Sequence, residues 1–387
     1  MVEAVIVSAV RTPIARFGGS LAKMEPYEFG AIVMKEALKR AEVDGNEVED
    51  VVFGNCLAGG GNMARVSLLQ AGLPVEVAGL TVDRQCGSGI NSVALASDHV
   101  KLNEQQIYIA GGTESMTRSP YLMAPQEKPF DRLPPSFLKR RLSPESIGDP
   151  PMGITAETVA DFYNISRQEQ DQYALQSQMR MAHAMENGFF EEQIISLHVP
   201  SQKGLTVFKE DEHPRPNSNI ERLSQLKPVF KQNGTVTAGN ASGVNDGAAA
   251  LVVMSATQAK QRGLKPLAKI VNWVVAGVHP TMMGMGPVPA IQKLLQKTNV
   301  SLADIDLVEI NEAFAAQILA CNKELNIDMD KLNVNGGAIA HGHPIAATGS
   351  MLITKLCYEM QRSGAKNGIV SACVGGGQGI ALLLESM

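Results

Sequence analysis

The chain has 387 residues, of which 44% are hydrophobic and 19% are charged, and this composition is typical of a folded globular protein and not of a disordered one. Its length predicts two or three compact domains. With 34 Lys and Arg against 39 Asp and Glu, the formal net charge of -5 gives no global field that attracts nucleic acid or an anionic membrane. We therefore expect neither nucleic acid nor a membrane as a partner.

Cysteine usage indicates the redox environment. The sequence holds five cysteines, namely Cys56, Cys86, Cys321, Cys357 and Cys373. No two of them are spaced as a Cys-x-x-Cys metal or redox motif, and an odd number without short-range pairing indicates reduced thiols. The uncharged run at residues 4–10 is too short for a signal peptide. We therefore expect a cytoplasmic protein without a metal site.

Two uncharged stretches, residues 270–292 and 332–354, are long enough to span a bilayer. Prolines interrupt the first, and glycines and a proline interrupt the second, so neither is a continuous membrane helix. We interpret both as buried polypeptide folded around a site.

The first 120 residues alternate between strand-like and helical patterns. The predicted elements are, in order, a strand at 5–7, a helix at 28–40, a strand at 51–54, a helix from about residue 87 and a strand at 107–110. This alternation predicts an α/β architecture.

The last 120 residues repeat the plan. Their predicted elements are a strand at 269–271, a helix at 288–297, a strand at 305–310, a helix after His343 and a strand at 368–373. Asn55 precedes Cys86 by 31 residues, and Asn311 precedes His343 by 32. An internal duplication explains this spacing, and it places one reactive side chain at an equivalent, glycine-flanked helix start in each half.

The middle of the chain has a different composition. Residues 119–150 carry seven prolines and a basic run, which do not form a regular core element. One helix is predicted after them, opened by a capping box at Ser166 and closed at Asn187. We divide the chain into an N-terminal half at 1–117, an inserted loop domain with return to the N-terminal half at 118–250, and a C-terminal half at 251–387.

Cys86 precedes an uncharged helical segment. The helix dipole and free N–H groups there favour a thiolate and can also hold an oxyanion. An average cysteine is more often a small buried hydrophobe. Gly87 and Gly89 favour a reactive thiol here, because we expect them to let a substrate approach the backbone.

Three further side chains could carry chemistry. His343 is presented from a glycine-rich turn and could act as a general base paired with Cys86, although a lone histidine is more often structural. Cys373 supplies a second thiol beside a glycine cluster and could act as an acid or base on carbon. Asn311 follows an apolar strand and either holds a water molecule or caps a helix.

Taken together, the motifs resemble the thiolase family along essentially the whole chain. The matching segments, in family order, are residues 11–13, the segment around Cys86, and residues 111–116, 152–157, 239–243, 284–290, 311–314, 342–344 and 373–377. The resemblance implies the α/β thiolase fold, with duplicated βαβαβαββ halves in five αβαβα layers and an inserted loop domain. It also implies a homodimer or a homotetramer.

The resemblance assigns catalytic roles. Cys86 would become acylated, His343 would activate it and line an oxyanion site, and Cys373 would move a proton to or from C2 of the acetyl group. Asn311 would hold a water molecule that completes the first oxyanion hole with His343. The N–H groups of Cys86 and Gly375 would form the second hole.

Substrate contacts are implied in the same way. Ser242 would lie along the pantetheine of coenzyme A. Met152, Met283 and Phe314 would wall the acyl pocket, although core packing explains such apolar residues about as well.

The implied activity is that of an acyltransferase that joins acetyl-CoA units and cleaves 3-oxoacyl-CoA by a reversible Claisen reaction through an acyl-cysteine. Acetyl-CoA C-acetyltransferase activity on acetoacetyl-CoA is preferred, with coenzyme A as a substrate and no separate cofactor. Three departures from the family pattern, at Pro151, His341 and Ala346, leave a broader-chain 3-ketoacyl-CoA thiolase of fatty-acid β-oxidation as the alternative.

Two rival classes share this architecture. A ketoacyl synthase pairs its cysteine with two histidines or with histidine and asparagine, and the Cys373 segment argues for a thiolase instead. An inactive lipid-binding relative is expected to lose the nucleophile, whereas Cys86 is present.

Overall fold

The computed structural model describes residues 2–58, 60–126, 128–130, 134, 136–202 and 204–387. The N-terminal half comprises β1 (Ala4–Arg11), β2 (Ala15–Arg16), α1 (Pro26–Arg40), β3 (Val48–Gly54), α2 (Met63–Gln70), β4 (Ala78–Val82), α3 (Ser88–Leu102), β5 (Ile107–Ser115) and β10 (Asn245–Ser255). The C-terminal half follows α7 (Ala256–Gln261) and comprises β11 (Ala268–Gly277), α8 (Pro287–Thr298), β12 (Leu307–Ile310), α9 (Ala315–Leu325), α10 (Ala338–His341), α11 (Ile345–Ser363), β13 (Asn367–Val374) and β14 (Gln378–Glu385).

The strands of both halves form one ten-stranded sheet in the order β12-β13-β14-β11-β1-β10-β5-β3-β4, with β2 paired to β10. The halves meet where β1 and β11 run antiparallel, with Ala4 opposite Ile270. In each half a first strand, two parallel inner strands and an antiparallel last strand occur in the same chain order. The duplication that the sequence predicts is therefore visible in the strand pairing.

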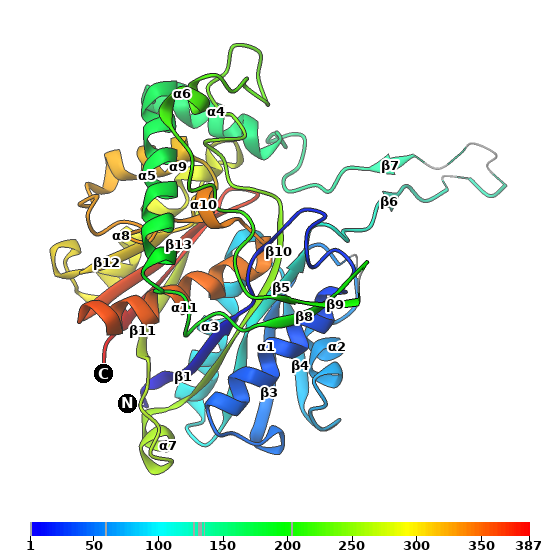
Figure 1. Cartoon of the computed structure of the whole chain (residues 1–387), viewed down its shortest axis with the longest axis vertical. Helices are drawn as coiled ribbons and strands as arrows, with labels where there is room; N and C mark the ends of the chain where they lie inside the picture. The colour runs from blue at the N-terminus through cyan, green and yellow to red at the C-terminus, as the bar shows by residue number, and fades with distance from the viewer. Residues whose placement is uncertain (1, 59, 127, 131–133, 135, 203) are drawn as a thin grey trace.

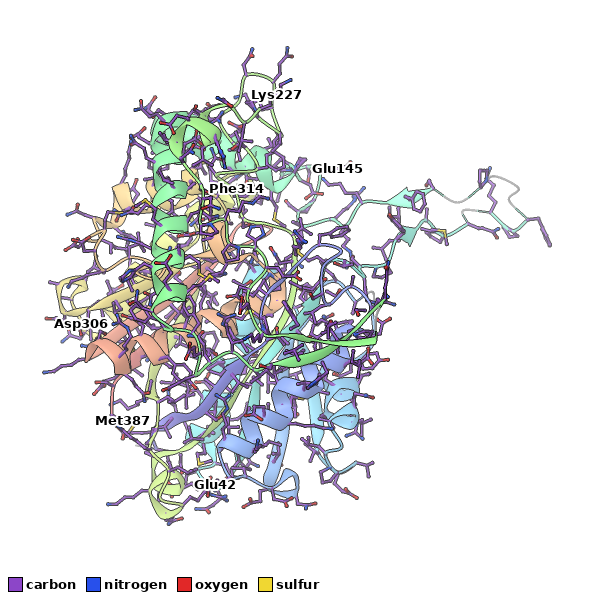
Figure 2. The ribbon with its side chains drawn as sticks, viewed as in Figure 1. Glu42, Glu145, Lys227, Asp306, Phe314 and Met387 are labelled. Carbon is purple, nitrogen blue, oxygen red and sulfur yellow. The ribbon has the colours of Figure 1, made fainter. Side chains whose placement is uncertain are left out.

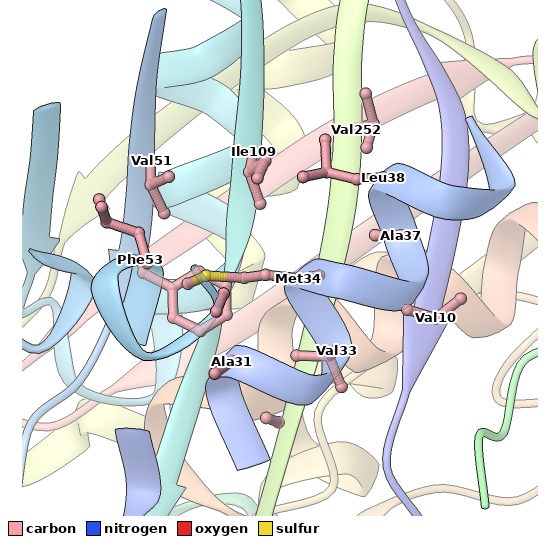
Figure 3. Close-up of a cluster of buried hydrophobic side chains, with 14 of the residues drawn as sticks. Val10, Ala31, Val33, Met34, Ala37, Leu38, Val51, Phe53, Ile109 and Val252 are labelled. Atoms are coloured by element: carbon pink, nitrogen blue, oxygen red, sulfur yellow. The ribbon is translucent and has the colours of Figure 1, made fainter. Parts of the chain in front are cut away.

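Helices cover the sheet in layers (Figure 1). Figure 3 shows Met34 and Leu38 of α1 on the side of the helix that faces the sheet. These two side chains belong to one apolar cluster with Phe53 of β3 and Val252 of β10. A second cluster joins α3 and α11 to both halves of the sheet, and a third joins α8 and α9 to the C-terminal half. The five layers are therefore outer helices, the N-terminal half of the sheet, the inner helices α3 and α11, the C-terminal half of the sheet, and outer helices. The predicted five-layer α/β fold is confirmed.

The inner helices α3 and α11 approach through glycine. A Cβ on Gly89 would lie 2.4 Å from the backbone nitrogen of Ser350, and a Cβ on Gly349 would lie 2.4 Å from that of Ile90. Only hydrogen fits at both positions. This close crossing brings the N-terminal ends of the two helices together, and these are the ends beside Cys86 and His343.

The chain leaves the sheet at Ser115 and returns to it at Asn245. Between these points lie β6 (Leu122–Met123), β7 (Phe137–Leu138), α4 (Met152–Tyr163), α5 (Arg167–Glu186), β8 (Leu197–Ser201), β9 (Gly204–Phe208) and α6 (Ile220–Ser224). The predicted helix is α5, and its N-cap Ser166 accepts a hydrogen bond from the Glu169 N–H. The helices α4 and α6 were not predicted. In Figure 1, β6 and β7 form an arm that extends away from the body.

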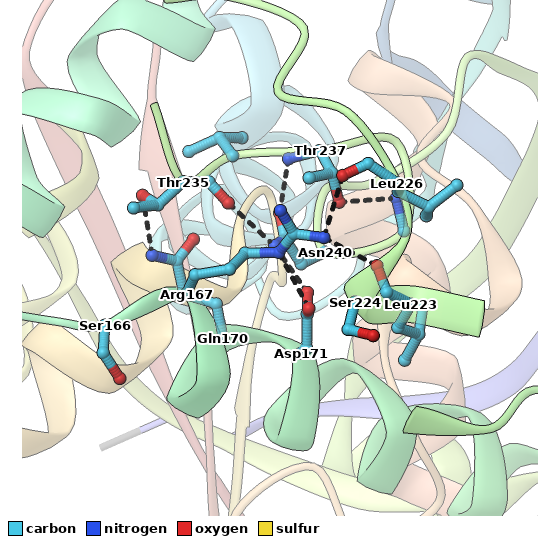
Figure 4. A network of polar contacts seen from close by, with 12 residues as sticks. Ser166, Arg167, Gln170, Asp171, Leu223, Ser224, Leu226, Thr235, Thr237 and Asn240 are labelled. Carbon is cyan, nitrogen blue, oxygen red and sulfur yellow. Dashed lines mark hydrogen bonds and ion pairs between the residues drawn. The ribbon is translucent and has the colours of Figure 1, made fainter. Parts of the chain in front are cut away.

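A polar network fixes the inserted loops to α5 (Figure 4). Arg167 donates to Asp171 and to the carbonyls of Leu223 and Leu226, and Asp171 accepts a hydrogen bond from Asn240. The loop that carries Asn240 is therefore held at a fixed position beside the C-terminal half. Within the described residues, no helix is both long enough and apolar enough to cross a membrane.

Candidate active site

Cys86 lies in a single 3-10 turn, Gln85–Gly87, directly before α3. The residue before it, Gln85, has φ of 45°, a left-handed conformation that is uncommon outside glycine. The Ser88 hydroxyl donates to the Gln85 carbonyl at 2.7 Å and accepts from the Arg84 N–H at 2.8 Å, so the turn is closed on both sides. The turn holds the Cys86 side chain in the interior of the protein, where it is 2% exposed.

The neighbouring glycines do not serve the purpose expected from the sequence. A Cβ on Gly87 would lie 2.9 Å from side-chain methyl groups of Ile380 and Val374, and Gly89 faces the backbone of α11. Both glycines therefore allow close packing inside the protein. The expectation that they open the backbone to substrate is wrong.

His343 is positioned by Asn245 of β10. Gly342, with φ of 100°, makes the turn, and a Cβ there would lie 2.5 Å from the Asn245 side chain. The Asn245 side-chain oxygen accepts the His343 N–H at 2.9 Å, and its amide donates to the Ala15 carbonyl at 3.1 Å. The imidazole of the C-terminal half is thus fixed by a residue of the N-terminal half.

The Cys86 Sγ lies 3.2 Å from Nε2 of His343. On the other side of the ring, Nδ1 lies 2.6 Å from the Thr348 hydroxyl, which donates its own proton to the Pro344 carbonyl at 3.0 Å. Because that hydroxyl proton is already engaged, Thr348 accepts the proton of Nδ1. Nε2 then has a free lone pair directed at the thiol, which is the tautomer that a general base needs.

Asn311 joins this pair. Its side-chain nitrogen lies 3.4 Å from Nε2 of His343, its backbone N–H donates to the Ser371 carbonyl, and its buried side-chain oxygen has no hydrogen-bond partner. The alternative of a helix cap is wrong, because α9 begins at Ala315 with Phe314 as its N-cap. The free amide oxygen leaves capacity to bind a small polar molecule.

Cys373 and Gly375 also lie close to the Cys86 thiol. Cys373 is fully buried on β13, opposite Gly379 of β14, and Gly375 follows in the turn between these strands. Burial raises the pKa of Cys86, and the backbone N–H groups of Gly375 and of Cys86 itself oppose that rise because they favour the thiolate form. The structure therefore brings together Cys86, His343, Asn311, Cys373 and Gly375 from four separate segments.

Burial governs the protonation of this cluster. It raises the pKa of Cys86 to about 12 despite the two N–H donors, and it lowers the pKa of His343 to about 4. Burial also raises the pKa of Cys373 well above its usual value. The N–H groups favour the thiolate at Cys86 as expected, but desolvation outweighs them. Thiol and imidazole are both neutral at rest.

The predicted wall residues lie in one apolar cluster. Met283 and Phe314 pack with Cys373 and Ala241, and Met152 contacts the cluster from α4. Phe314, which is labelled in Figure 2, is buried. A small, partly open depression beside Gly375 is lined by residues that include Met152 and Met283.

Ser242 lies on the neighbouring segment. The preceding residue, Ala241, forms a β-bridge with Phe314, and the Ser242 N–H donates to the Ala313 carbonyl at 3.0 Å. Asn240 connects this segment to the network of Figure 4. Ser242 is thus half-buried at the edge of the apolar cluster.

Four residues of the site were not found from the sequence, namely Leu142, Phe230, Asn245 and Thr348. Thr348 lies on the first turn of α11, but helical spacing does not mark it, because His343 precedes the helix and lies five residues away, not three or four. Leu142 contacts Gly375, and the Phe230 ring meets Phe314 edge-on at 6.2 Å. No local signal marks these two, because their contacts depend on how the insertion folds back.

Comparison with protein families matches residues 4–257 to the thiolase N-terminal domain and residues 264–386 to the thiolase C-terminal domain. The chain belongs to the thiolase family. This thiolase is 48% identical over 394 residues to acetyl-CoA acetyltransferase of Escherichia coli (strain K12), across 100% of both chains.

Two solved structures are also similar. The Bacillus anthracis acetyl-CoA acetyltransferase has a TM-score of 0.94 and 44% identity, and the match covers 100% of this thiolase and 99% of that chain. Human mitochondrial 3-ketoacyl-CoA thiolase has a TM-score of 0.94 and 40% identity with the same coverage.

Proposed function

We propose that this thiolase is an acetyl-CoA C-acetyltransferase, which catalyses reversible Claisen condensation and thiolysis between acetyl-CoA and a 3-oxoacyl-CoA through an acyl-cysteine. The observation that carries the proposal is the neutral thiol–imidazole pair of Cys86 and His343, with the second thiol of Cys373 in the adjoining cluster. A Claisen enzyme needs both a thioester carrier and a separate base for carbon.

In the first half-reaction, Nε2 of His343 takes the Cys86 proton as the sulfur attacks the thioester carbonyl of acetyl-CoA. A C–S bond forms, and the carbonyl electron pair moves onto oxygen, where a hydrogen-bond donor set stabilises it. The C–S bond to coenzyme A then breaks. His343 returns the proton to the departing thiolate, and acetyl-Cys86 remains.

In the second half-reaction, Cys373 passes its own proton to Nε2 of His343 and, as the thiolate, removes a proton from C2 of a second acetyl-CoA. The resulting enolate attacks the carbonyl of acetyl-Cys86, the C–S bond to Cys86 breaks as acetoacetyl-CoA forms, and the Cys86 sulfur takes the proton back from Nε2. The raised pKa of Cys373 suits a base that acts on a weak carbon acid. The N–H groups of Cys86 and Gly375 receive the oxyanion of the acyl-enzyme. A water molecule on Asn311, together with His343, receives the enolate oxygen.

The acyl pocket favours a short chain. The Phe230 ring packs edge-on against Phe314 and also fills the space beside Gly153. The pocket wall that Phe314 forms with Met152 and Met283 therefore has little freedom to move. The relatives named acetyl-CoA acetyltransferase support this reading over a broad-chain 3-ketoacyl-CoA thiolase.

Coenzyme A enters as a substrate, and no separate cofactor is needed. Its phosphates carry negative charge, and a polar groove next to Ala238 and Gly239 contains Arg215 and Arg222. We propose that this groove holds the phosphates, with the pantetheine running past Ser242 toward Cys86.

Assembly is proposed from two exposed surfaces. The arm exposes large apolar side chains, including Tyr121 at 86% and Phe137 at 73%, and β4 is an edge strand with Leu80 partly exposed. Such surfaces are typical of contacts between copies. We propose a homodimer or homotetramer in the cytoplasm, where the five free cysteines stay reduced.

The test is a thiolysis assay with acetoacetyl-CoA and with 3-oxooctanoyl-CoA. We expect kcat/KM to be at least about 10-fold higher for acetoacetyl-CoA, because a rigid wall discriminates by roughly that factor per methylene. A flat or rising profile with chain length would establish the broader-chain alternative.

A further inference from the structure

Glu114 is a fully buried carboxylate that the mechanism above does not use. It lies near the end of β5 and accepts four hydrogen bonds. One carboxylate oxygen accepts from the Asn55 side chain and the Leu57 N–H, each at 3.1 Å. The other accepts from the Cys56 N–H and the Ala346 N–H, each at 3.2 Å.

These donors come from two sides of the active site. Ala346 lies in the first turn of α11, three residues after His343. Cys56 lies in the loop after β3, and its sulfur is 3.3 Å from the Ser88 hydroxyl that closes the Cys86 turn. Glu114 therefore bridges the helix that carries the base and the loop that supports the nucleophile.

Burial raises the pKa of Glu114 to about 7, and the backbone N–H donors around it oppose that rise because they stabilise the ionised carboxylate. All four neighbours are N–H donors, and a protonated acid would direct its own O–H at one of them. Burying a charge is costly, and it is tolerated here because every acceptor direction is used. An apolar side chain would leave four buried donors without a partner.

The 55–57 loop is also fixed from its outer side. Arg140, at the base of the arm, donates to the carbonyls of Cys56 at 3.0 Å and Leu57 at 3.2 Å. Both the N–H and the C=O groups of these two residues are therefore engaged. The loop is a rigid support and not a mobile cover.

We propose that Glu114 is a positioning residue that sets the separation between His343 Nε2 and Cys86 Sγ by tying the first turn of α11 to the 55–57 loop. The inference rests on the proposed function, since it concerns the same thiol–imidazole pair. Glu114 contacts neither of the two reacting atoms, and it acts by positioning both His343 and the loop that supports the Cys86 turn.

A double-mutant cycle distinguishes positioning from general stability. Glu114→Gln removes acceptor capacity, and we expect a loss of about 10- to 100-fold in kcat with KM changed less than about 2-fold, because small misplacements of a catalytic group have effects of that size. In the His343→Asn background, Glu114→Gln should change the residual rate less than about 2-fold. The readouts are acetoacetyl-CoA thiolysis and the single-turnover rate of Cys86 acetylation.

Glu359→Gln is the matched control. Glu359 is also a buried carboxylate, and it accepts three hydrogen bonds. It lies on α11, the helix that carries Ala346, about 20 Å beyond that residue at the usual helical rise. We expect this variant to change kcat less than about 2-fold. If Glu114→Gln does not fold, Glu114→Asp is used instead, because it keeps the charge but shortens the side chain by one methylene. We expect Glu114→Asp also to lower kcat with little change in KM, and to have little effect in the His343→Asn background.

Equal losses from the Glu114 change in both backgrounds, or unchanged kcat in a folded variant, would overturn the positioning role. A wild-type protein without thiolysis would instead overturn the proposed function. The two failures are therefore separate.

Discussion

Nε2 of His343 lies 3.2 Å from the sulfur of Cys86, although 257 residues separate them in the chain. Each residue stands before an inner helix of its own half, Cys86 before α3 and His343 before α11. Because these helices cross at Gly89 and Gly349, their N-terminal ends meet. The duplication thus brings one reactive side chain from each half into contact.

Thr348→Val tests how the imidazole is oriented. The variant keeps the shape of the side chain but removes the oxygen that accepts the Nδ1 proton, so the population of the correct tautomer should fall. We expect kcat to fall about 10- to 100-fold with little change in KM. Steady-state thiolysis measures this.

Thr354→Val is the control for that variant. Thr354 is equally buried on α11, and its hydroxyl donates only to the Ser350 carbonyl. It should retain nearly full activity. Equal activity losses in the two variants would mean that Thr348 has no special role.

The pH dependence follows from the lowered pKa of His343, which is about 4. The base must be neutral, so in the Glu114→Gln variant, which has no titrating carboxyl group at position 114, kcat/KM should stay constant as the pH falls from 8 to 5 and should decline only as the pH passes through about 4. An ordinary histidine would give a decline near 6.5. Rates measured after brief acid exposure, with circular dichroism to confirm folding, give the midpoint. A midpoint near 6.5 would contradict the neutral pair.

Cys373→Ser separates the two half-reactions. The serine hydroxyl is a far weaker acid and base toward carbon, but Cys86 and His343 are untouched. We expect condensation and thiolysis to fall at least about 100-fold, while exchange of labelled coenzyme A into acetyl-CoA falls less than about 10-fold. If both reactions fell equally, Cys373 would also be needed for acylation.

The phosphate groove is tested with Arg222→Gln and Arg215→Gln. Each should raise KM for acetyl-CoA about 10-fold or more by removing a charge-assisted contact. S-acetyl-N-acetylcysteamine carries no phosphate, so its kcat/KM should change less than about 2-fold. An equal loss with both substrates would place the two arginines outside the phosphate site.

The fold and the reactive residues could be predicted from the sequence because both leave local patterns that recur in the two halves of the chain. Cys86 and His343 stand just before predicted helices and Cys373 ends a predicted strand, so local pattern and internal repetition locate them. The protonation state could not be predicted, because it depends on burial by residues distant in the chain. Glu114 and Asn245 were not assigned for the same reason, since their partners come from other strands and loops.

The most direct measurement is the site of acetylation. Incubation with acetyl-CoA followed by peptide mass spectrometry should show one acetyl group on Cys86 in the wild type and none in Cys86→Ala. Cys373→Ser should still acetylate at Cys86. An acetyl group on Cys373 with none on Cys86 would exchange the two roles and contradict the mechanism.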